Sequence, residues 1–485
     1  MPFGCRVFFW FGYCFPCEVT DLIEEFDVLV LGSGEAGKYL AWTCAEAGHK
    51  TALVERRWVG GSCPNIACLP SKNVIYSAKV VSLMRRAEEF GVRECAPVVD
   101  MAGVRARKRR MVDGLVAVHE KRYASSGVEL VMGQGKFVGP RTLEVALNGG
   151  GTRTLRGAKM IVSTGSRATV PDVPGMREAA PMTHIEALEL DVVPGHLLVL
   201  GGGYIGLELA QAYARLGAKV TVLEHGERLL PKEDDDTFAE ITAMCAREGI
   251  EVLTRVVVES VEGVSGDAVT LHGTLGGEAV AISGTHLLAA AGRTPNTDGI
   301  GLEAAGIALT ERGFIQVNDR LETTAEHTWA VGDCAGSPQF THAAFDDFRI
   351  VRANLEGGNR SAKGRLMPSV LFTDPEIAHV GLSENEARAA GKAYRLVKIP
   401  MAAVLRSRTL SEETGFLKAL IDAESDAILG FTAVGVEAGE ILGVVELAMR
   451  VGAPYTAVRD AVLPHPTMGE GLTVLFAAKP TLHGG

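Results

Sequence analysis

The chain has 485 residues and a formal net charge of −11, with 47% hydrophobic residues, 22% charged residues and 57 glycines. A chain of this length exceeds what one hydrophobic core fills, so about three globular domains are expected. The charge argues against a nucleic-acid partner, which needs clustered Lys and Arg, and nine scattered cysteines favour a reducing, cytoplasmic location over a disulfide-stapled secreted fold.

The first 23 residues are predicted to be a tail. Their apolar stretch, 7–15, is far shorter than the ~20 residues that cross a bilayer. It has only Arg6 as a basic lead-in and no small-residue cleavage pattern, so it does not resemble a signal peptide. Cys14-Phe-Pro-Cys17 has the spacing of a redox or metal-binding pair but stands outside any strand-helix-strand unit. We therefore expect no membrane anchor, no metal site and no function for these two cysteines.

Two segments of the chain repeat one pattern of strand, glycine turn, helix, strand and acid. The first copy has strand 28–31, Gly32, Gly34 and Gly37, a helix ending at Gly48, strand 51–54 and Glu55. The second copy has strand 197–200, Gly201, Gly203 and Gly206, a helix ending at Gly217, strand 220–223 and Glu224. In both copies the first glycine stands 23 residues before the glutamate. The agreement indicates an internal repeat.

The spacing of this repeat is typical of dinucleotide binding. The first glycine makes the tight turn, the second lets backbone amides approach a pyrophosphate, and the third lets the helix pack on the strand. The helix N-terminus holds the phosphates, and the acid accepts hydrogen bonds from the adenosine ribose. Two such units predict FAD together with a nicotinamide cofactor. Glu224 would repel a 2′-phosphate and no arginine follows before Arg228, so NADH is predicted over NADPH.

Cys63 and Cys68 follow the first repeat and are separated by four residues. In a regular helix such positions lie about 8–9 Å apart, whereas a disulfide needs Cα atoms within about 7 Å. Pro64 suits the first position of a helix and disfavours helical backbone at the residue before it. We therefore expect Cys63 to fold back toward Cys68. The start of the helix also lowers a thiol pKa and favours the reactive thiolate.

The segment Gly60-Gly-Ser-Cys63-Pro-Asn-Ile-Ala-Cys68-Leu-Pro-Ser-Lys72 resembles the redox-disulfide signature of the class I pyridine nucleotide-disulfide oxidoreductases. This family includes dihydrolipoamide dehydrogenase, glutathione reductase and mercuric reductase. The resemblance extends from about residue 26 to about residue 476. Its other landmarks are Ser163-Thr-Gly165-Ser, Gly292-Arg293-Thr-Pro-Asn296, Val331-Gly332-Asp333 and His465-Pro466-Thr-Met-Gly-Glu470.

The resemblance implies a role for each matching residue. Cys68 is implied to lie against the flavin and Cys63 to exchange with substrate. The other implied roles are an ion pair beside flavin N5 (Lys72 and Glu208), an aromatic gate over the nicotinamide pocket (Tyr204), a ligand of the ribityl chain (Asp333), further cofactor contacts (Thr164, Gly165, Gly292 and Arg293) and an acid–base couple (His465 and Glu470). In that couple the carboxylate orients the imidazole, which moves the proton of the exchange thiol.

The same resemblance implies an α/β fold with two Rossmann-like dinucleotide-binding domains and a C-terminal α+β dimerisation domain. The FAD-binding domain is expected at 24–168 and 293–363, the NAD(P)-binding domain at 169–292, and the dimerisation domain of a homodimer at 364–485. Within the last domain, the run from Ala427 to Val445 has the pattern of an apolar strand followed by an amphipathic helix.

The electron acceptor is the least determined feature. The His-Pro-Thr segment is shared with dihydrolipoamide dehydrogenase and glutathione reductase, and no cysteine follows Cys334, so the C-terminal thiol pair of mercuric reductases is missing. Ser62, Pro64 and Ala67 depart from dihydrolipoamide dehydrogenases. We predict an oxidoreductase of the dihydrolipoamide type acting on a small or protein-bound disulfide. A metal-ion or quinone reductase is the second hypothesis, and a low-turnover flavin redox sensor or complex subunit is the third.

Overall fold

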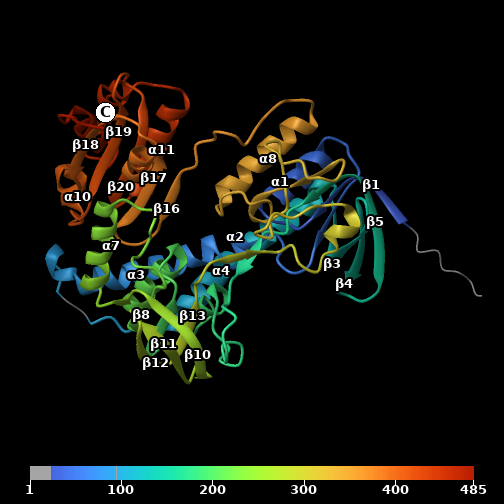
Figure 1. The fold of residues 1–485 in the computed structure, drawn as a ribbon, viewed down its shortest axis with the longest axis horizontal. Coiled ribbons are helices and arrows are strands. Elements are labelled where there is room, and N and C mark those ends of the chain that lie inside the picture. Colours follow the sequence, from blue (N-terminus) through green and yellow to red (C-terminus); the bar gives the residue numbers. More distant parts are fainter. Residues whose placement is uncertain (1–22, 94–95, 485) are drawn as a thin grey trace, which may run out of the picture.

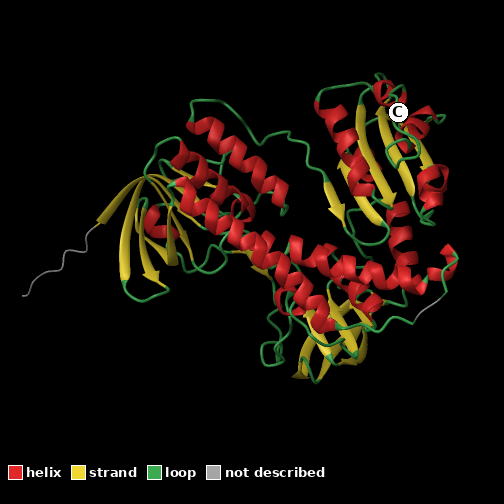
Figure 2. Cartoon of the chain, turned by 180° about the vertical axis from the view of Figure 1, so that it is seen from behind, coloured by secondary structure: helices red, strands yellow, loops and turns green. Residues whose placement is uncertain are grey.

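The computed structural model of the chain describes residues 23–93 and 96–484 (Figure 1). The predicted tail up to residue 22, with Cys14 and Cys17, lies outside these residues. The described chain forms three bodies, each built on its own sheets, and long helices run through the middle of the molecule (Figure 2).

The first body is built on a six-stranded sheet in which β1 runs parallel to both β2 and β5. β3 pairs in parallel with β2 and then forms an antiparallel meander with β4 and β5, while β15 pairs with the C-terminal part of β5 on the edge opposite β1. The strands are β1 (Ile23–Leu31), β2 (Thr51–Glu55), β3 (Glu129–Gly139), β4 (Thr142–Leu147), β5 (Thr152–Val162) and β15 (Thr328–Ala330). The central strands are buried on both faces, which is why they appear in the sequence as continuous apolar runs.

The strand β1 begins earlier than its apolar run indicates. Residues 23–26 already pair with 154–157 of β5, ahead of the run that starts at Val28. Glu24 in this extension forms an ion pair with Arg153, with the carboxylate and guanidinium 2.6 Å apart. The extension is partly exposed and acidic, so the hydrophobic pattern could not reveal it.

Helices cover this sheet and connect it to the rest of the chain. Helices α1 (Glu35–Glu46) and α8 (Thr341–Leu355) pack side by side on one face of the sheet (Figure 1). A short helix, α2 (Ser62–Asn65), leads into α3 (Cys68–Arg85), which packs against both α4 (Met101–Ser126) and α6 (Tyr204–Leu216). The single turns of 3-10 helix here are η1 (Ala87–Phe90), η2 (Leu302–Ala305) and η3 (Gly332–Ala335).

The second body combines a parallel sheet, β13-β7-β8-β9, with an antiparallel sheet, β10-β11-β12. Its strands are β7 (His196–Leu200), β8 (Lys219–Leu223), β9 (Glu251–Leu253), β10 (Val256–Val264), β11 (Ala268–Leu275), β12 (Glu278–Gly284) and β13 (His286–Ala289). Its helices, besides α6, are α5 (His184–Ala187) and α7 (Asp235–Arg247). The chain enters and leaves this body through the antiparallel pair β6 (Ser166–Ala168) and β14 (Arg293–Pro295).

The predicted internal repeat is present in the structure. In the first copy, α1 connects the parallel neighbours β1 and β2. In the second copy, α6 connects the parallel neighbours β7 and β8. Shortly after each helix comes a glycine with positive φ, Gly48 at +89° and Gly217 at +114°, a backbone region that glycine adopts readily. The α/β class with two dinucleotide-binding units is therefore confirmed.

The third body is a six-stranded antiparallel sheet of order β16-β17-β20-β19-β18-β21. Its strands are β16 (Ser369–Leu371), β17 (Glu376–Gly381), β18 (Tyr394–Pro400), β19 (Phe416–Asp422), β20 (Ile428–Gly435) and β21 (Thr481–His483). Its helices are α9 (Glu384–Ala389), η4 (Met401–Ala403), α10 (Leu405–Thr409), α11 (Ala438–Arg450), α12 (Tyr455–Arg459) and α13 (Gly471–Ala477). The strand and helix predicted for 427–445 are β20 and α11.

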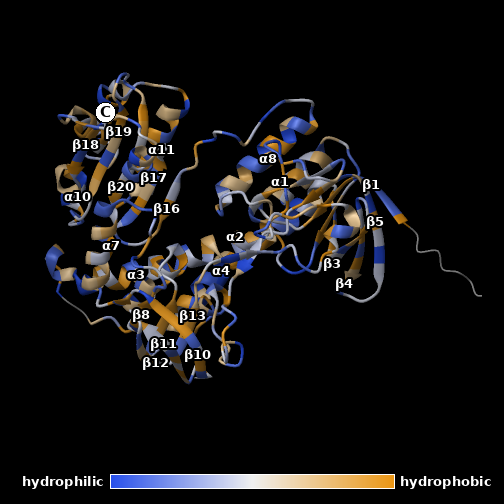
Figure 3. Cartoon of the chain, in the orientation of Figure 1, coloured by the Kyte–Doolittle hydropathy of each residue, from blue (hydrophilic) through white to orange (hydrophobic). Residues whose placement is uncertain are grey.

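Hydrophobic residues concentrate on the inner strands of the sheets (Figure 3). Among the helices of the described chain, none is both long and apolar enough to cross a membrane.

A buried ionic cluster around Lys418 of β19 joins the second and third bodies. Lys418 Nζ lies 2.8 Å from Asp234 Oδ2 and 2.9 Å from Asp236 Oδ1, both next to the start of α7. It also lies 3.1 Å from Glu384 Oε1 of α9. Burial alone would lower the pKa of Lys418, but hydrogen bonds to the two aspartates outweigh it and raise the pKa. The three carboxylates therefore surround an ammonium group.

Replacing Lys418 with methionine is expected to destabilise the protein by about 3–5 kcal/mol, because two buried carboxylates and one half-buried carboxylate lose their shared counter-ion. The urea midpoint of unfolding measures the effect. Lys398→Met is the matched control: Lys398 Nζ contacts Asp236 at 2.7 Å, but its side chain is 38% exposed. That change should cost about 0–1 kcal/mol. Equal midpoints for the two variants would contradict a stabilising role for the buried cluster.

Candidate active site

The two cysteines lie on either side of a break between two helices. Cys63 is in α2 together with Pro64, and Cys68 is the first residue of α3. The expectation that Pro64 keeps Cys63 out of a helical turn is therefore wrong. The chain leaves the helical path at Ile66 and Ala67, where φ is −138° and −128°.

A side chain between the cysteines closes the turn before this break. Asn65 Nδ2 donates hydrogen bonds to the carbonyl oxygens of Gly61 (2.7 Å) and Val59 (3.0 Å). The backbone amides of Ile66 and Ala67 both donate to the Ser62 carbonyl, at 2.9 and 3.0 Å. One tightly closed turn thus precedes Cys68, which begins an 18-residue helix and lies at its positive end.

The environments of the two thiols differ, and both cysteines are free in the structure. The hydrogen bond with Cys63 lowers the pKa of Cys68 to about 6, although burial acts in the opposite direction. Thr341 and Lys72 lower it further, and Thr341 Oγ1 lies 3.3 Å from Cys68 Sγ. The hydrogen bond with Cys68, and then burial, raise the pKa of Cys63. Cys68 is therefore the thiolate of the reduced pair.

Thr341 was not found from the sequence. It is the first residue of α8 and lies 273 positions after Cys68 in the chain. No motif includes it, and the only sequence signal is its place at the start of a helix shortly after the Val331-Gly332-Asp333 landmark.

Lys72 and Glu208 are in contact, as the family resemblance implies for an ion pair. Lys72 Nζ donates to Glu208 Oε2 at 2.8 Å, and Glu208 Oε1 accepts from the backbone amide of Phe372 at 3.0 Å. Lys72 lies one helical turn after Cys68 on α3, while Glu208 comes from α6. Residues of both dinucleotide units thus meet beside the thiols. The position of the pair next to flavin N5 stays a prediction.

The glutamates that close the two repeats make matching hydrogen bonds. Glu55 Oε2 accepts from the amide of Ser33 at 2.9 Å, and Glu224 Oε2 accepts from the amide of Gly202 at 2.7 Å. In each copy the other carboxylate oxygen accepts, at 2.8 Å, from the amide two residues after the glutamate. Both carboxylates are thereby held at the edge of a glycine turn.

The glycine turns fit the pyrophosphates of two dinucleotides. Helices α1 and α6 begin after Gly34 and Gly203, and at neither start does a side chain cap the free amides. A Cβ on Gly37 would lie 2.4 Å from the Gly32 carbonyl oxygen, and one on Gly206 would lie 2.0 Å from that of Gly201. Only glycine allows these approaches, so the amides of each helix start remain available to phosphate oxygens.

The other predicted cofactor residues meet where β6 and β14 pair. Ser166 Oγ donates to Asp333, and Arg293 Nε donates to Ser166 Oγ at 2.8 Å. Thr164 Oγ1 is buried and has no hydrogen-bond partner within the described chain, as expected for a hydroxyl that contacts a cofactor. Gly165 and Gly292 have positive φ, +67° and +112°.

His465 and Glu470 form a couple on the third body. His465 Nδ1 lies 2.9 Å from Glu470 Oε2, and the histidine side chain is 61% exposed. Within residues 23–93 and 96–484, no hydrogen bond or ion pair connects either residue to Cys63 or Cys68. One chain by itself therefore does not bring the predicted acid–base couple into contact with the thiols.

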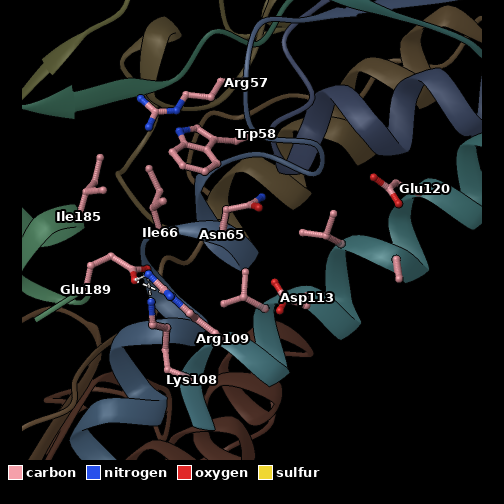
Figure 4. A pocket seen from close by; sticks show the side chains of 13 residues that line it. Arg57, Trp58, Asn65, Ile66, Lys108, Arg109, Asp113, Glu120, Ile185 and Glu189 are labelled. Atoms are coloured by element: carbon pink, nitrogen blue, oxygen red, sulfur yellow. Dashed lines mark hydrogen bonds and ion pairs between the residues drawn. The ribbon is translucent and has the colours of Figure 1, made fainter. Parts of the chain in front are cut away.

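A cavity of about 480 Å³ lies between α4 and the segment that precedes the cysteine helix (Figure 4). Trp58, Asn65 and Ile66 line one side of it, and Glu189 forms ion pairs with Lys108 and Arg109 at one end. Neither cysteine lines this cavity.

Comparison with known families gives two matches. The family described as pyridine nucleotide-disulphide oxidoreductase matches residues 26–347, and its dimerisation domain matches residues 367–475. The first match spans more than half of the chain.

The chain belongs to the class I pyridine nucleotide-disulfide oxidoreductases. As a member of this family it is a flavoprotein enzyme that uses FAD and NAD(P)H, and it carries the family's dimerisation domain.

Relatives of several names align over nearly the whole chain. The probable pyridine nucleotide-disulfide oxidoreductase RclA of Escherichia coli is 34% identical, covering 94% of this chain and 99% of RclA. A dihydrolipoyl dehydrogenase of Thermus scotoductus is 36% identical (93% and 96%), and a mercuric reductase of Bacillus cereus is 33% identical (92% and 70%). The structure of a Cu(II) complex of RclA, described as a flavoprotein disulfide reductase, superposes with a TM-score of 0.86 at 34% identity, covering 94% and 99% of the two chains.

The nucleotide preference of this oxidoreductase is expected to be for NADH. Arg228, the first arginine after Glu224 in the chain, donates to Asp235 Oδ1 at 2.7 Å and to the Glu233 carbonyl at 3.1 Å, so it is held by other partners. A 2′-phosphate would face the Glu224 carboxylate, and two like charges oppose binding. We expect kcat/KM for NADH to exceed that for NADPH by about tenfold or more. An NADPH value equal to or above that for NADH would contradict this.

Proposed function

We propose that this enzyme passes electrons from NADH through FAD to the Cys63–Cys68 pair and from there to a disulfide substrate of the lipoamide type, as a dihydrolipoamide dehydrogenase-like enzyme. The observation that supports this most directly is the asymmetry of the pair. Cys68, with its pKa of about 6, is ionised at neutral pH, while Cys63 keeps its proton because its pKa is raised. The two thiols are thus differentiated before any substrate binds.

The proposed reaction uses this difference in two exchange steps. FAD, when bound, supplies two-electron transfer between a nicotinamide and a dithiol. Cys63 loses its proton and attacks the substrate disulfide, forming a mixed disulfide and releasing the first substrate thiol. The Cys68 thiolate then attacks Cys63 Sγ, which releases the second thiol and leaves the Cys63–Cys68 disulfide. The substrate gains two electrons and two protons, one proton from Cys63 by way of its base and one from solvent, and the cysteine pair loses two electrons.

The first step needs a base, because the pKa of Cys63 is raised. We assign this role to His465, which Glu470 orients through the 2.9 Å contact with Nδ1. The histidine is exposed and makes no contact with Cys63 in its own chain, so we propose that it serves the thiols of the partner subunit in a homodimer. The dimerisation domain, in which both residues lie, supports this arrangement.

A metal-ion reductase is the second candidate, because the related RclA was solved with Cu(II). Steady-state oxidation of NADH with lipoamide, oxidised glutathione, a quinone, Cu(II) and Hg(II) separates the candidates. Turnover with lipoamide above all other acceptors is the expected result. Turnover with a metal ion or quinone and none with a disulfide would overturn the proposal. Reduction of the flavin without turnover on any acceptor would favour a redox sensor.

The domain boundaries at residues 168, 292 and 363 and the cytoplasmic location stay predictions.

A further inference from the structure

Tyr204 lies between the nicotinamide unit and the thiol site. It is the first residue of α6, directly after Gly203 of the second glycine turn. Its ring centroid is 6.4 Å from that of Phe340, and Phe340 directly precedes Thr341, which contacts Cys68. A nucleotide seated on the second glycine turn must pass this ring if its nicotinamide is to approach the flavin beside Cys68.

The hydroxyl of Tyr204 is bonded to a partly buried carboxyl group that no motif includes. Tyr204 Oη donates to Glu233 Oε1 at 3.3 Å. Burial raises the pKa of Glu233, and the ionised form is favoured by nearby His379 of β17 and by the bond from Tyr204. Asp234 opposes that ionised form and Lys418 favours it. The hydrogen bond from Tyr204 is therefore one of the few interactions that stabilise the Glu233 carboxylate.

The segment around Glu233 is fixed from several sides. The Glu233 carbonyl accepts from Arg228 Nη2 at 3.1 Å and from Asn385 Nδ2 at 3.3 Å. The next residue, Asp234, accepts from the amides of Glu384 and Asn385 at 3.0 and 2.9 Å and from buried Lys418. The third body thus anchors the backbone that carries Glu233, whereas Tyr204 is attached to its partner only through its hydroxyl.

We propose that Glu233 is a positioning residue that holds Tyr204 across the nicotinamide entrance until the nucleotide binds. The inference rests on the proposed placement of NADH at the second glycine turn. Binding of nicotinamide displaces the ring and breaks the bond between Tyr204 and Glu233. Because this hydrogen bond must break when the nucleotide binds, it weakens the affinity of the wild-type enzyme for the nucleotide.

The proposal also predicts the direction in which the dissociation constant for nucleotide changes with pH. The bond from Tyr204 stabilises ionised Glu233 while the ring is in place, so displacing the ring raises the pKa of the carboxyl group further. Lower pH therefore favours the displaced ring, and the dissociation constant for nucleotide should fall as pH falls. Glutamine at this position does not ionise, so this component of the pH dependence should vanish in Glu233→Gln.

The test is a titration of the oxidised, FAD-loaded dimer with NAD⁺, which binds without reducing the flavin. Flavin fluorescence monitors binding and gives the dissociation constant. Glu233→Ala and Tyr204→Phe should each lower the dissociation constant about fivefold, the amount typical of one hydrogen bond. The double variant should lower it no further than either single variant, because both changes remove the same bond. Glu240→Ala, on helix α7 seven residues after Glu233, is the matched control and should leave the constant unchanged.

Two results would overturn the proposal, and they are distinguishable. If the dissociation constant stays at the wild-type value in Glu233→Ala, Glu233→Gln and Tyr204→Phe while NADH still reduces the flavin, Glu233 does not hold the ring and the proposed function stands. If wild-type enzyme neither binds NAD⁺ nor has its flavin reduced by NADH, the proposed function fails and the inference fails with it. Additive effects in the double variant would likewise overturn the shared bond.

Discussion

Cys63→Ser is expected to yield an oxidised enzyme with a long-wavelength absorption band that needs no reductant. Without its partner thiol, Cys68 cannot form the disulfide and is predicted to remain free beside the flavin. In the wild-type pair the hydrogen bond from Cys63, and then Thr341 and Lys72, lower the pKa of Cys68. Serine at position 63 can donate the same hydrogen bond, and Thr341 and Lys72 remain, so a thiolate is expected at pH 8. A thiolate in contact with oxidised flavin gives a charge-transfer band, recorded by absorption spectroscopy of the purified protein. The band should weaken as the pH is lowered and the Cys68 thiolate is protonated.

The matched variant is Cys68→Ser. It leaves Cys63, whose pKa is raised by burial once its bond to Cys68 is gone, so no band is expected at pH 8. Both variants should lose disulfide turnover by about three orders of magnitude or more, because each lacks one thiol of the exchange pair. A band in Cys68→Ser and none in Cys63→Ser would mean that the order of the thiols is reversed.

The sequence was sufficient for those parts of the fold that depend on local backbone constraints. The glycines of both repeats could be assigned because a side chain at Gly37 or Gly206 would collide with the turn before it. The matching spacing to Glu55 and Glu224 reflects one geometry, in which the carboxylate reaches the amide of the glycine turn. Such features depend on a few residues close together in the sequence, so they can be recognised without tertiary information.

The sequence was insufficient where the structure depends on contacts between distant segments. Thr341 meets Cys68 only because α8 packs beside the first sheet, and Asp234 meets Lys418 only because the third body docks on the start of α7. The break at Ile66 and Ala67 also escaped prediction, because the proline rule placed the irregular residue before Pro64. The hydrogen bonds that close the turn come after the proline, and propensity alone does not specify them.

Neither the sequence nor the structure of one chain by itself explains how His465 reaches the thiols. The family resemblance names it as the proton carrier, yet in one chain it is exposed and bonded to Glu470. Because the raised pKa of Cys63 disfavours its thiolate, we propose that the base comes from the other chain of the assembly. A two-fold homodimer provides one, because each chain can supply its third body to the thiols of the other. This arrangement makes a prediction that no single-site variant can test.

Two inactive variants, mixed in one dimer, are expected to recover activity. Cys63→Ser lacks the exchange thiol and His465→Ala lacks its base, so each homodimer should be nearly inactive. If the site is shared, a mixed dimer has one site with both lesions and one site with neither. Unfolding and refolding the two variants together in equal amounts makes half of the dimers mixed, so about one quarter of wild-type lipoamide turnover should return.

Two controls make the mixing experiment decisive. Each variant refolded alone should stay inactive, which shows that refolding itself restores nothing. Different affinity tags on the two variants allow the mixed dimers to be isolated, and in that fraction about half of the wild-type turnover is expected. If each chain instead used its own histidine, every site of a mixed dimer would carry one lesion. Isolated mixed dimers without activity would therefore show that His465 acts on the thiols of its own chain.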